Sequence, residues 1–105
     1  MGIFGKRGGK GMDEYVAEAE QAGATIVDVR EPSEYAQGHV PGAINVPLGS
    51  IGGIEGTLPD KDASVYVYCL SGMRSSRACG ILKRMGYANA INIGGIDSYR
   101  GPVER

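Results

Sequence analysis

The sequence predicts an α/β domain with a mainly parallel central sheet of four or five strands and helices on both faces. Short apolar runs alternate along the chain with segments of helical periodicity, which is typical of parallel sheets. The run at 65–69 is apolar or aromatic on both faces, as in a strand that helices cover from both sides. The 105 residues contain no internal repeat, so a single domain is expected.

The first half of the chain begins with a glycine-rich stretch. Residues 1–11 carry five glycines and three basic side chains, which predicts a flexible basic arm ahead of a domain at 12–105. Apolar residues at helical spacing predict a first helix from residue 12, and Gly23 is well placed to end it. An apolar run at 24–29 is the first strand expected. A proline then suits the first position of a short helix over 32–37.

The second half contains the strand at 65–69 and the longest helical pattern. The expected elements are, in chain order, a strand at 43–46, a short helix or turn at 49–55, the strand at 65–69, a helix at 73–85, a strand at 90–93 and a helical turn at 96–100. Gly86 follows the long helical pattern directly, where a residue in the left-handed region commonly ends a helix.

Composition and charge exclude several functional classes. A formal net charge of −1 argues against general nucleic-acid binding. Two cysteines and one histidine fit no common zinc spacing and no disulfide framework, so we expect no metal, no cofactor and a reducing compartment. No apolar run is long enough for a signal peptide or a membrane span, which favours a cytoplasmic location. The helix expected at 73–85 is basic, and its charged face is either simply solvated or attracts an anion or a partner.

Cys69 stands where a strand ends and a helix begins. The backbone N–H groups of 70–74 are free to converge above its sulfur, because the first N–H groups of a helix have no partner within the helix. A thiolate there also gains from the helix dipole and from the guanidinium of Arg74. We therefore expect Cys69 to be an activated thiol. The second cysteine, Cys79, falls among apolar helix residues and is expected in the core, with a resolving-thiol role as the alternative.

Three blocks of sequence resemble the rhodanese (thiosulfate sulfurtransferase) family. The active-site loop of that family has a cysteine, an internal glycine and a closing arginine followed by Ser or Thr, and Cys69, Gly72, Arg74 and Ser75 fill these places. The N-terminal signature is matched by Asp28-Val29-Arg30-Glu31, Glu34-Tyr35 and Gly38-His39-Val40-Pro41-Gly42-Ala43-Ile44-Asn45. The C-terminal signature is matched by Asn92-Ile93-Gly94-Gly95, Tyr99 and Gly101-Pro102. All blocks occur in the order of the family, and the resemblance covers nearly everything from Ala24 onward.

The resemblance implies that Cys69 is the catalytic nucleophile and that the loop after it binds the substrate. The loop residues are Leu70, Ser71, Gly72, Met73, Arg74 and Ser75. The fork of Arg74 is expected to face the anionic group of the substrate or to hold the loop. The hydroxyls of Ser71 and Ser75 either donate to the sulfur or cap the helix.

Three residues of the N-terminal signature are implied to support the fold rather than to react: Asp28, Arg30 and His39. Asp28 and Arg30 are expected to tie the first strand to its neighbours by charged hydrogen bonds. His39 is the only histidine and therefore a tempting base, but the resemblance implies a structural role.

The activity implied is that of a single-domain sulfurtransferase without a cofactor. Cys69 would take sulfane sulfur from thiosulfate or a persulfide as a Cys69 persulfide and pass it to a thiol or to cyanide. The expected partners are a small anionic donor such as thiosulfate, a thiol or cyanide acceptor, and a sulfur-carrier protein. No nucleic acid and no membrane are expected.

Two alternatives use the same cysteine. The first is a persulfide carrier that serves a partner desulfurase without turnover of its own. The second is a phosphatase or arsenate reductase on the same fold. Four residues separate Cys69 from Arg74, which is the sulfurtransferase spacing, whereas the related phosphatases have one more. A tetrahedral oxyanion needs the wider loop, so the sequence favours sulfur transfer.

Overall fold

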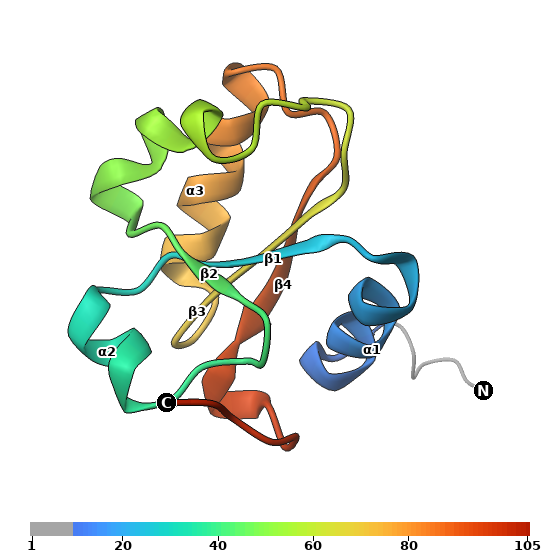
Figure 1. Ribbon diagram of the computed structural model, residues 1–105, viewed down its shortest axis with the longest axis vertical. Coiled ribbons are helices and arrows are strands. Elements are labelled where there is room, and N and C mark those ends of the chain that lie inside the picture. Colours follow the sequence, from blue (N-terminus) through green and yellow to red (C-terminus); the bar gives the residue numbers. More distant parts are fainter. Residues whose placement is uncertain (1–9) are drawn as a thin grey trace.

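The computed structural model describes residues 10–105 and shows one sheet of four parallel strands in the order β2-β1-β3-β4 (Figure 1). The strands are β1 (Thr25–Asp28), β2 (Ile44–Asn45), β3 (Val65–Cys69) and β4 (Ala90–Gly95). The helices are α1 (Met12–Ala22), α2 (Pro32–Gln37) and α3 (Met73–Arg84), with 3₁₀ segments η2 (Leu48–Gly56) and η3 (Ile96–Ser98). The expected α/β class and parallel sheet are confirmed. The arm expected at 1–11 lies outside the described residues except for Lys10 and Gly11.

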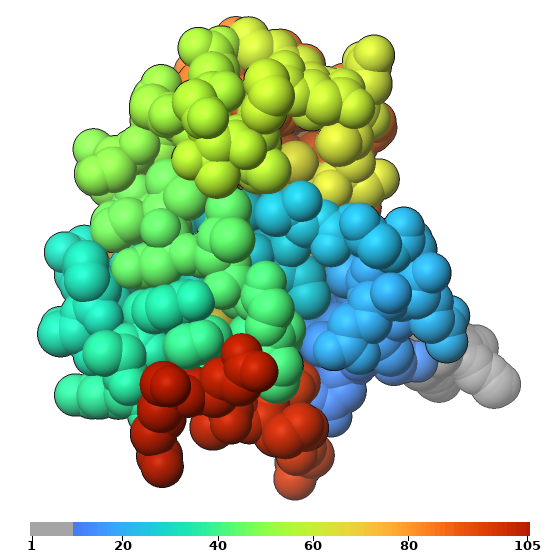
Figure 2. Space-filling model, in the orientation of Figure 1, coloured from blue at the N-terminus to red at the C-terminus, as the bar shows by residue number. Residues whose placement is uncertain are grey.

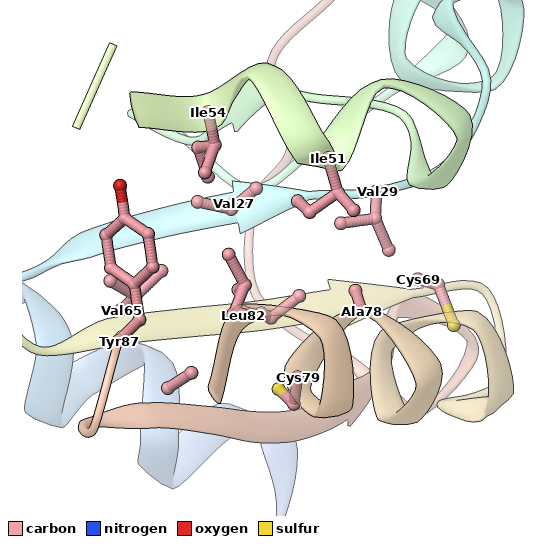
Figure 3. Packing of buried hydrophobic residues seen from close by; sticks show 12 residues of the cluster. Val27, Val29, Ile51, Ile54, Val65, Cys69, Ala78, Cys79, Leu82 and Tyr87 are labelled. Carbon is pink, nitrogen blue, oxygen red and sulfur yellow. The ribbon is translucent and has the colours of Figure 1, made fainter. Parts of the chain in front are cut away.

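Strand β3 is buried on both faces, as its sequence predicts. Val65, Val67 and Cys69 face a core that α3 and η2 cover, and this core also contains Ile51, Ile54, Ala78 and Leu82 (Figure 3). Tyr66 and Tyr68 face the opposite core, which α1 covers with Met12, Val16 and Ala19. Helices α1 and α3 therefore lie on opposite sides of the sheet (Figure 1). Apolar burial on both faces is the main stabilising contribution to such a layered fold.

Strand β2 is shorter than expected, because only Ile44 and Asn45 pair with β1. The side-chain amide of Asn45 instead donates to the carbonyl oxygens of Asp28 at 2.9 Å and Arg30 at 3.0 Å. Together with the backbone hydrogen bonds from Val46 N to Asp28 O and from Leu48 N to Val29 O, these contacts hold the end of β1. None of the helices among residues 10–105 combines the length and the apolar character needed to cross a membrane.

A buried ion pair fixes the segment after β1. Arg30 Nη2 donates to Asp28 Oδ2 at 2.8 Å and to the Gly38 carbonyl at 2.7 Å. Next to Gly38, His39 forms an antiparallel bridge with Glu104 near the C-terminus. Figure 2 shows the C-terminal segment, in red, lying against the residues that follow α2. Arg30 thus connects the end of β1 to Gly38 after α2, while the Asp28–Arg30 pair itself joins two positions of the same segment.

Strand β4 runs past its expected end at residue 93 to Gly95, with an irregular register opposite Val67 and Tyr68. This extension brings β4 against the loop after β3. A Cβ atom placed on Gly95 would lie 2.1 Å from the carbonyl oxygen of Leu70. The backbone N–H of Asp97 donates to the same oxygen at 3.1 Å. Only glycine allows this approach, so Gly95 sets the distance between β4 and the loop.

Gly95→Ala should therefore lower the free energy of unfolding by about 1–3 kcal/mol, because the added methyl group meets backbone atoms rather than a movable side chain. Urea unfolding followed by circular dichroism measures this. Gly80→Ala is the matched control, because a Cβ at Gly80 meets nothing within 4 Å. In helix α3 that change should instead stabilise the protein by roughly 0.5–1 kcal/mol. Equal stability of the two variants would contradict the role assigned to Gly95.

Candidate active site

The candidate site lies at the carboxyl end of β3, where Cys69 is the last strand residue and is only 1% exposed. We call residues 70–75 the active-site loop. The chain turns into α3 at Gly72, whose φ of +101° lies in the left-handed region that favours glycine. Figure 3 shows the sulfur of Cys69 beside the first turns of α3. This is the strand-to-helix position that the sequence predicts for Cys69.

Three groups of the loop hydrogen-bond the Cys69 sulfur. The backbone N–H of Gly72 donates to Sγ at 3.1 Å and that of Ser75 at 3.3 Å, and Ser75 Oγ lies 3.4 Å away. Burial opposes the charged thiolate, but hydrogen bonds from Ser75, Gly72 and Ser71 outweigh it, so the pKa of Cys69 is lowered from its ordinary value. A buried thiol with inward-pointing N–H donors is suited to act as a nucleophile.

The hydroxyl of Ser75 has one proton and three candidate acceptors, one of which is the Gly94 carbonyl oxygen at 3.4 Å. It lies 2.7 Å from Asn92 Oδ1 and 3.4 Å from the sulfur, so the proton is directed mainly to Asn92. A neutral Cys69 thiol can then donate its own proton to Ser75 Oγ. When Cys69 is a thiolate, the backbone N–H groups of Gly72 and Ser75 provide the firmer support. Helix α3 has no side-chain N-cap, so the capping role considered for Ser71 and Ser75 is wrong.

Asn92 on β4 belongs to the C-terminal signature, but the sequence alone assigns it no role in the site. Its Nδ2 donates to the Gly72 carbonyl at 3.1 Å, while its Oδ1 accepts from Gly94 N at 3.0 Å and from Ser75 Oγ. These contacts fix the orientation of the amide and connect β4 to the middle of the active-site loop at Gly72 and to its end at Ser75. The available signal was a polar residue within an otherwise apolar run at 90–93.

The Arg74 guanidinium is bound to Glu34 of α2. Its Nη1 donates to Oε1 at 2.8 Å and its Nη2 to Oε2 at 3.0 Å, a two-pronged contact. The hydrogen bonds from Arg74 lower the pKa of Glu34 to about 2. Glu34 in turn raises the pKa of Arg74, with a smaller contribution from the Cys69 thiolate. Arg74 is expected either to face the anionic group of the substrate or to hold the loop. Its contact with Glu34 connects the loop to α2, which is the second of these roles.

The remaining loop residues differ in exposure. Leu70 and Met73 are exposed by 47% and 79%, so two apolar side chains face solvent beside the buried sulfur. Ser71 is exposed as well. The loop thus exposes Leu70, Ser71 and Met73 to solvent, while the N–H groups of Gly72 and Ser75 point at the sulfur. Such a site can accept a small anion at the sulfur and an apolar surface around it.

His39 and Cys79 each make contacts that do not involve the Cys69 sulfur. The His39 ring stacks on Tyr35 with centroids 3.7 Å apart, and its Nδ1 lies 2.8 Å from the Tyr35 carbonyl oxygen. Its Nε2 lies 3.9 Å from Glu104 Oε1. Cys79 is buried in the core between the sheet and α3, and burial raises its pKa to about 11. Among residues 10–105, no three His, Cys, Asp or Glu side chains gather closely enough to hold a metal ion.

Comparison with known proteins agrees with this geometry. A family model described as the rhodanese-like domain matches residues 12–101. The chain belongs to the rhodanese family. Its relatives include the thiosulfate sulfurtransferase PspE of Escherichia coli, 44% identical over 77 residues that cover 72% of this chain and 74% of PspE. A sulfurtransferase of Allochromatium vinosum is 39% identical over 77 residues, covering 73% of this chain and 71% of that protein.

Solved structures support the same assignment. A rhodanese with anions from Escherichia coli superposes with a TM-score of 0.73 at 41% identity, covering 78% of this chain and 98% of that one. The rhodanese-like domain of an Anabaena protein gives a TM-score of 0.80 at 26% identity, covering 90% and 76% of the two chains. The rhodanese fold expected from the three sequence blocks is thus confirmed, and the chain is a member of a sulfurtransferase family.

The two thiols should differ sharply in reactivity. Iodoacetamide should alkylate Cys69 at pH 7 well before Cys79, because hydrogen bonds lower the pKa of Cys69 while burial raises that of Cys79 to about 11. The Cys79→Ser variant isolates Cys69, and the Cys69→Ser variant isolates Cys79. The alkylation rate of Cys69 should reach half its maximum below the free-thiol pKa of about 8.5. A midpoint at or above that value would contradict an activated thiolate.

Proposed function

We propose that the protein is a sulfurtransferase in which Cys69 carries the transferred sulfur as a persulfide. The observation that carries the proposal is the set of donors on the Cys69 sulfur, namely Gly72 N at 3.1 Å and Ser75 N at 3.3 Å. These donors favour an anionic sulfur at this position in both halves of the reaction. Cys69 alone is the nucleophile, and the proposed reaction needs no metal or cofactor.

The first half-reaction transfers a sulfur atom from the donor to Cys69. The Cys69 thiolate attacks the outer sulfur of thiosulfate, the S–S bond of thiosulfate breaks, and sulfite leaves with the electron pair of that bond. The product is a Cys69 persulfide whose terminal sulfur is anionic. The N–H groups of the active-site loop stabilise the charge as it moves, since they already point at the sulfur.

The second half-reaction removes the transferred sulfur from Cys69. An acceptor thiolate or cyanide attacks the terminal sulfur, and the Cys69 thiolate leaves with the electron pair of the persulfide bond. The lowered pKa of Cys69 supports this step as well, because a stabilised thiolate is a better leaving group. Two sequential displacements on one residue give ping-pong kinetics.

A carrier without turnover is the second candidate. A Bacillus subtilis relative named "Putative sulfur carrier protein YrkF" is 36% identical over 80 residues, which cover 75% of this chain and 43% of that protein. The exposed Leu70 and Met73 beside the sulfur also suit contact with a protein donor or acceptor. The carrier uses the same persulfide, but a protein donor loads it and it has no turnover of its own with thiosulfate.

Incubation of the reduced protein with thiosulfate, followed by desalting, should leave a species heavier by one sulfur atom, located by peptide mass spectrometry at Cys69. Cyanide should remove that sulfur as thiocyanate and restore the original mass. Cys69→Ser should show neither step, because a hydroxyl there has no base to activate it. Cys79→Ser should retain both.

Two results would change this conclusion. A persulfide that forms with a protein persulfide donor but never with thiosulfate would favour the carrier. Hydrolysis of an aryl phosphate without any sulfur uptake would favour the phosphatase chemistry that the spacing of Cys69 and Arg74 disfavours.

A further inference from the structure

The charges around the active-site loop cancel in pairs. Arg74 is bound to Glu34 at 2.8 and 3.0 Å, and Arg30 is bound to Asp28 at 2.8 Å. The two pairs lie near each other, since Arg30 contributes to the low pKa of Glu34 and Asp28 to the raised pKa of Arg74. Arg30 and Arg74 therefore each have a carboxylate partner. The Cys69 sulfur is supported by backbone dipoles and not by an unpaired positive charge.

Glu34 is itself held in place. Its Oε1 accepts the backbone N–H of Glu31 at 2.9 Å, which is the reciprocal contact of a capping box at the start of α2. The same oxygen accepts Arg74 Nη1, so the carboxylate is fixed between two helices. The side chains of Arg74 and Glu34 are 34% and 30% exposed, which leaves the pair within reach of a ligand at the loop.

This pairing affects what the site can recognise. A free arginine fork beside the nucleophile would bind the sulfonate end of thiosulfate, because guanidinium groups match planar or tetrahedral oxyanions in two-pronged contacts. Here Nη1 and Nη2 each donate to Glu34, so the edge that they form is occupied and an anion would meet only the remaining N–H groups of the guanidinium. A dianion approaching the Cys69 thiolate meets the N–H groups of the loop and an Arg74 guanidinium whose charge Glu34 compensates, and it must also approach the carboxylate of Glu34.

We propose that Glu34 is a specificity-determining residue that withholds Arg74 from the sulfur donor, so that the site favours persulfide donors over the thiosulfate dianion. The inference rests on the proposed sulfur transfer at Cys69. With a persulfide RS–SH, the Cys69 thiolate attacks the outer sulfur, the S–S bond breaks, and RS⁻ leaves with the electron pair while the outer sulfur stays on Cys69. This donor needs no cation for a sulfonate group, and its organic part can lie against Leu70 and Met73.

Steady-state kinetics with two donors test the proposal. Glu34→Gln should lower the KM for thiosulfate roughly three- to fivefold, the effect of one additional partly exposed charge contact. The KM for the persulfide of 2-mercaptoethanol, which has no other charged group, should change less than about twofold. Glu55→Gln is the matched control: it also removes a carboxylate from an ion pair, with Lys61, but at the far end of α3, where Lys61 donates to the Met85 carbonyl. It should leave both KM values unchanged.

The double variant Glu34→Gln/Arg74→Ala separates specificity from loop support. If Glu34 acts by occupying Arg74, the gain in thiosulfate affinity disappears in the double variant, whose KM should return to within about twofold of the wild type. A large rise in that KM would show that Arg74 binds thiosulfate in the wild type, and would overturn the proposal. A parallel fall in kcat with both donors for Glu34→Gln alone would reduce Glu34 to a structural support, and would also overturn it.

A binding measurement separates this inference from the proposed function. Sulfate is an unreactive dianion, and its protection of Cys69 against iodoacetamide reports anion binding without turnover. Glu34→Gln should be protected at roughly three- to fivefold lower sulfate concentration than the wild type. Equal protection would overturn the Glu34 inference even where the persulfide forms. Failure of the wild type to take sulfur from either donor would overturn the proposed function, while the sulfate measurement would still decide the role of Glu34.

Discussion

The close contact between the active-site loop and β4 is the constraint on which the site depends. Two carbonyl oxygens of the loop accept hydrogen bonds from β4 and η3: Leu70 O accepts from Asp97 N, and Gly72 O accepts from Asn92 Nδ2. Since the carbonyls point toward β4, the N–H groups of Gly72 and Ser75 are left to point at Cys69. The donors are therefore in place before any substrate binds, which is the condition for electrostatic stabilisation without reorganisation.

Much of the fold was predictable because its signals are local. The helical periodicity of α1 and α3 and the two-sided burial of β3 are properties of short segments, and each was found at nearly its expected bounds. The ends of β2 and β4 could not be predicted, because they depend on partners elsewhere in the chain. Asn45 adds side-chain hydrogen bonds to the end of β1, and β4 extends to Gly95 to meet the loop.

The residues of the site also fall into those that the sequence predicts and those that it does not. Cys69 and Gly72 could be assigned from a strand end, a glycine and a helix start, all within a few residues. Glu34 and Asn92 could not, because Glu34 lies 40 positions from Arg74 and Asn92 lies 17 from Ser75. The first pairing depends on where α2 lies relative to α3, and the second on the irregular register between β3 and β4. Neither is visible in the residues around the cysteine.

The protonation of Cys79 has a consequence for how sulfur leaves the protein. With a pKa raised to about 11, Cys79 remains a neutral thiol at physiological pH, and a neutral thiol is a poor nucleophile toward a persulfide. A loaded Cys69 therefore has no internal partner able to expel the sulfur as sulfide and close a disulfide. On the proposed mechanism the loaded form is a stored intermediate. Its lifetime is set by the concentration and identity of the molecule that collects the sulfur.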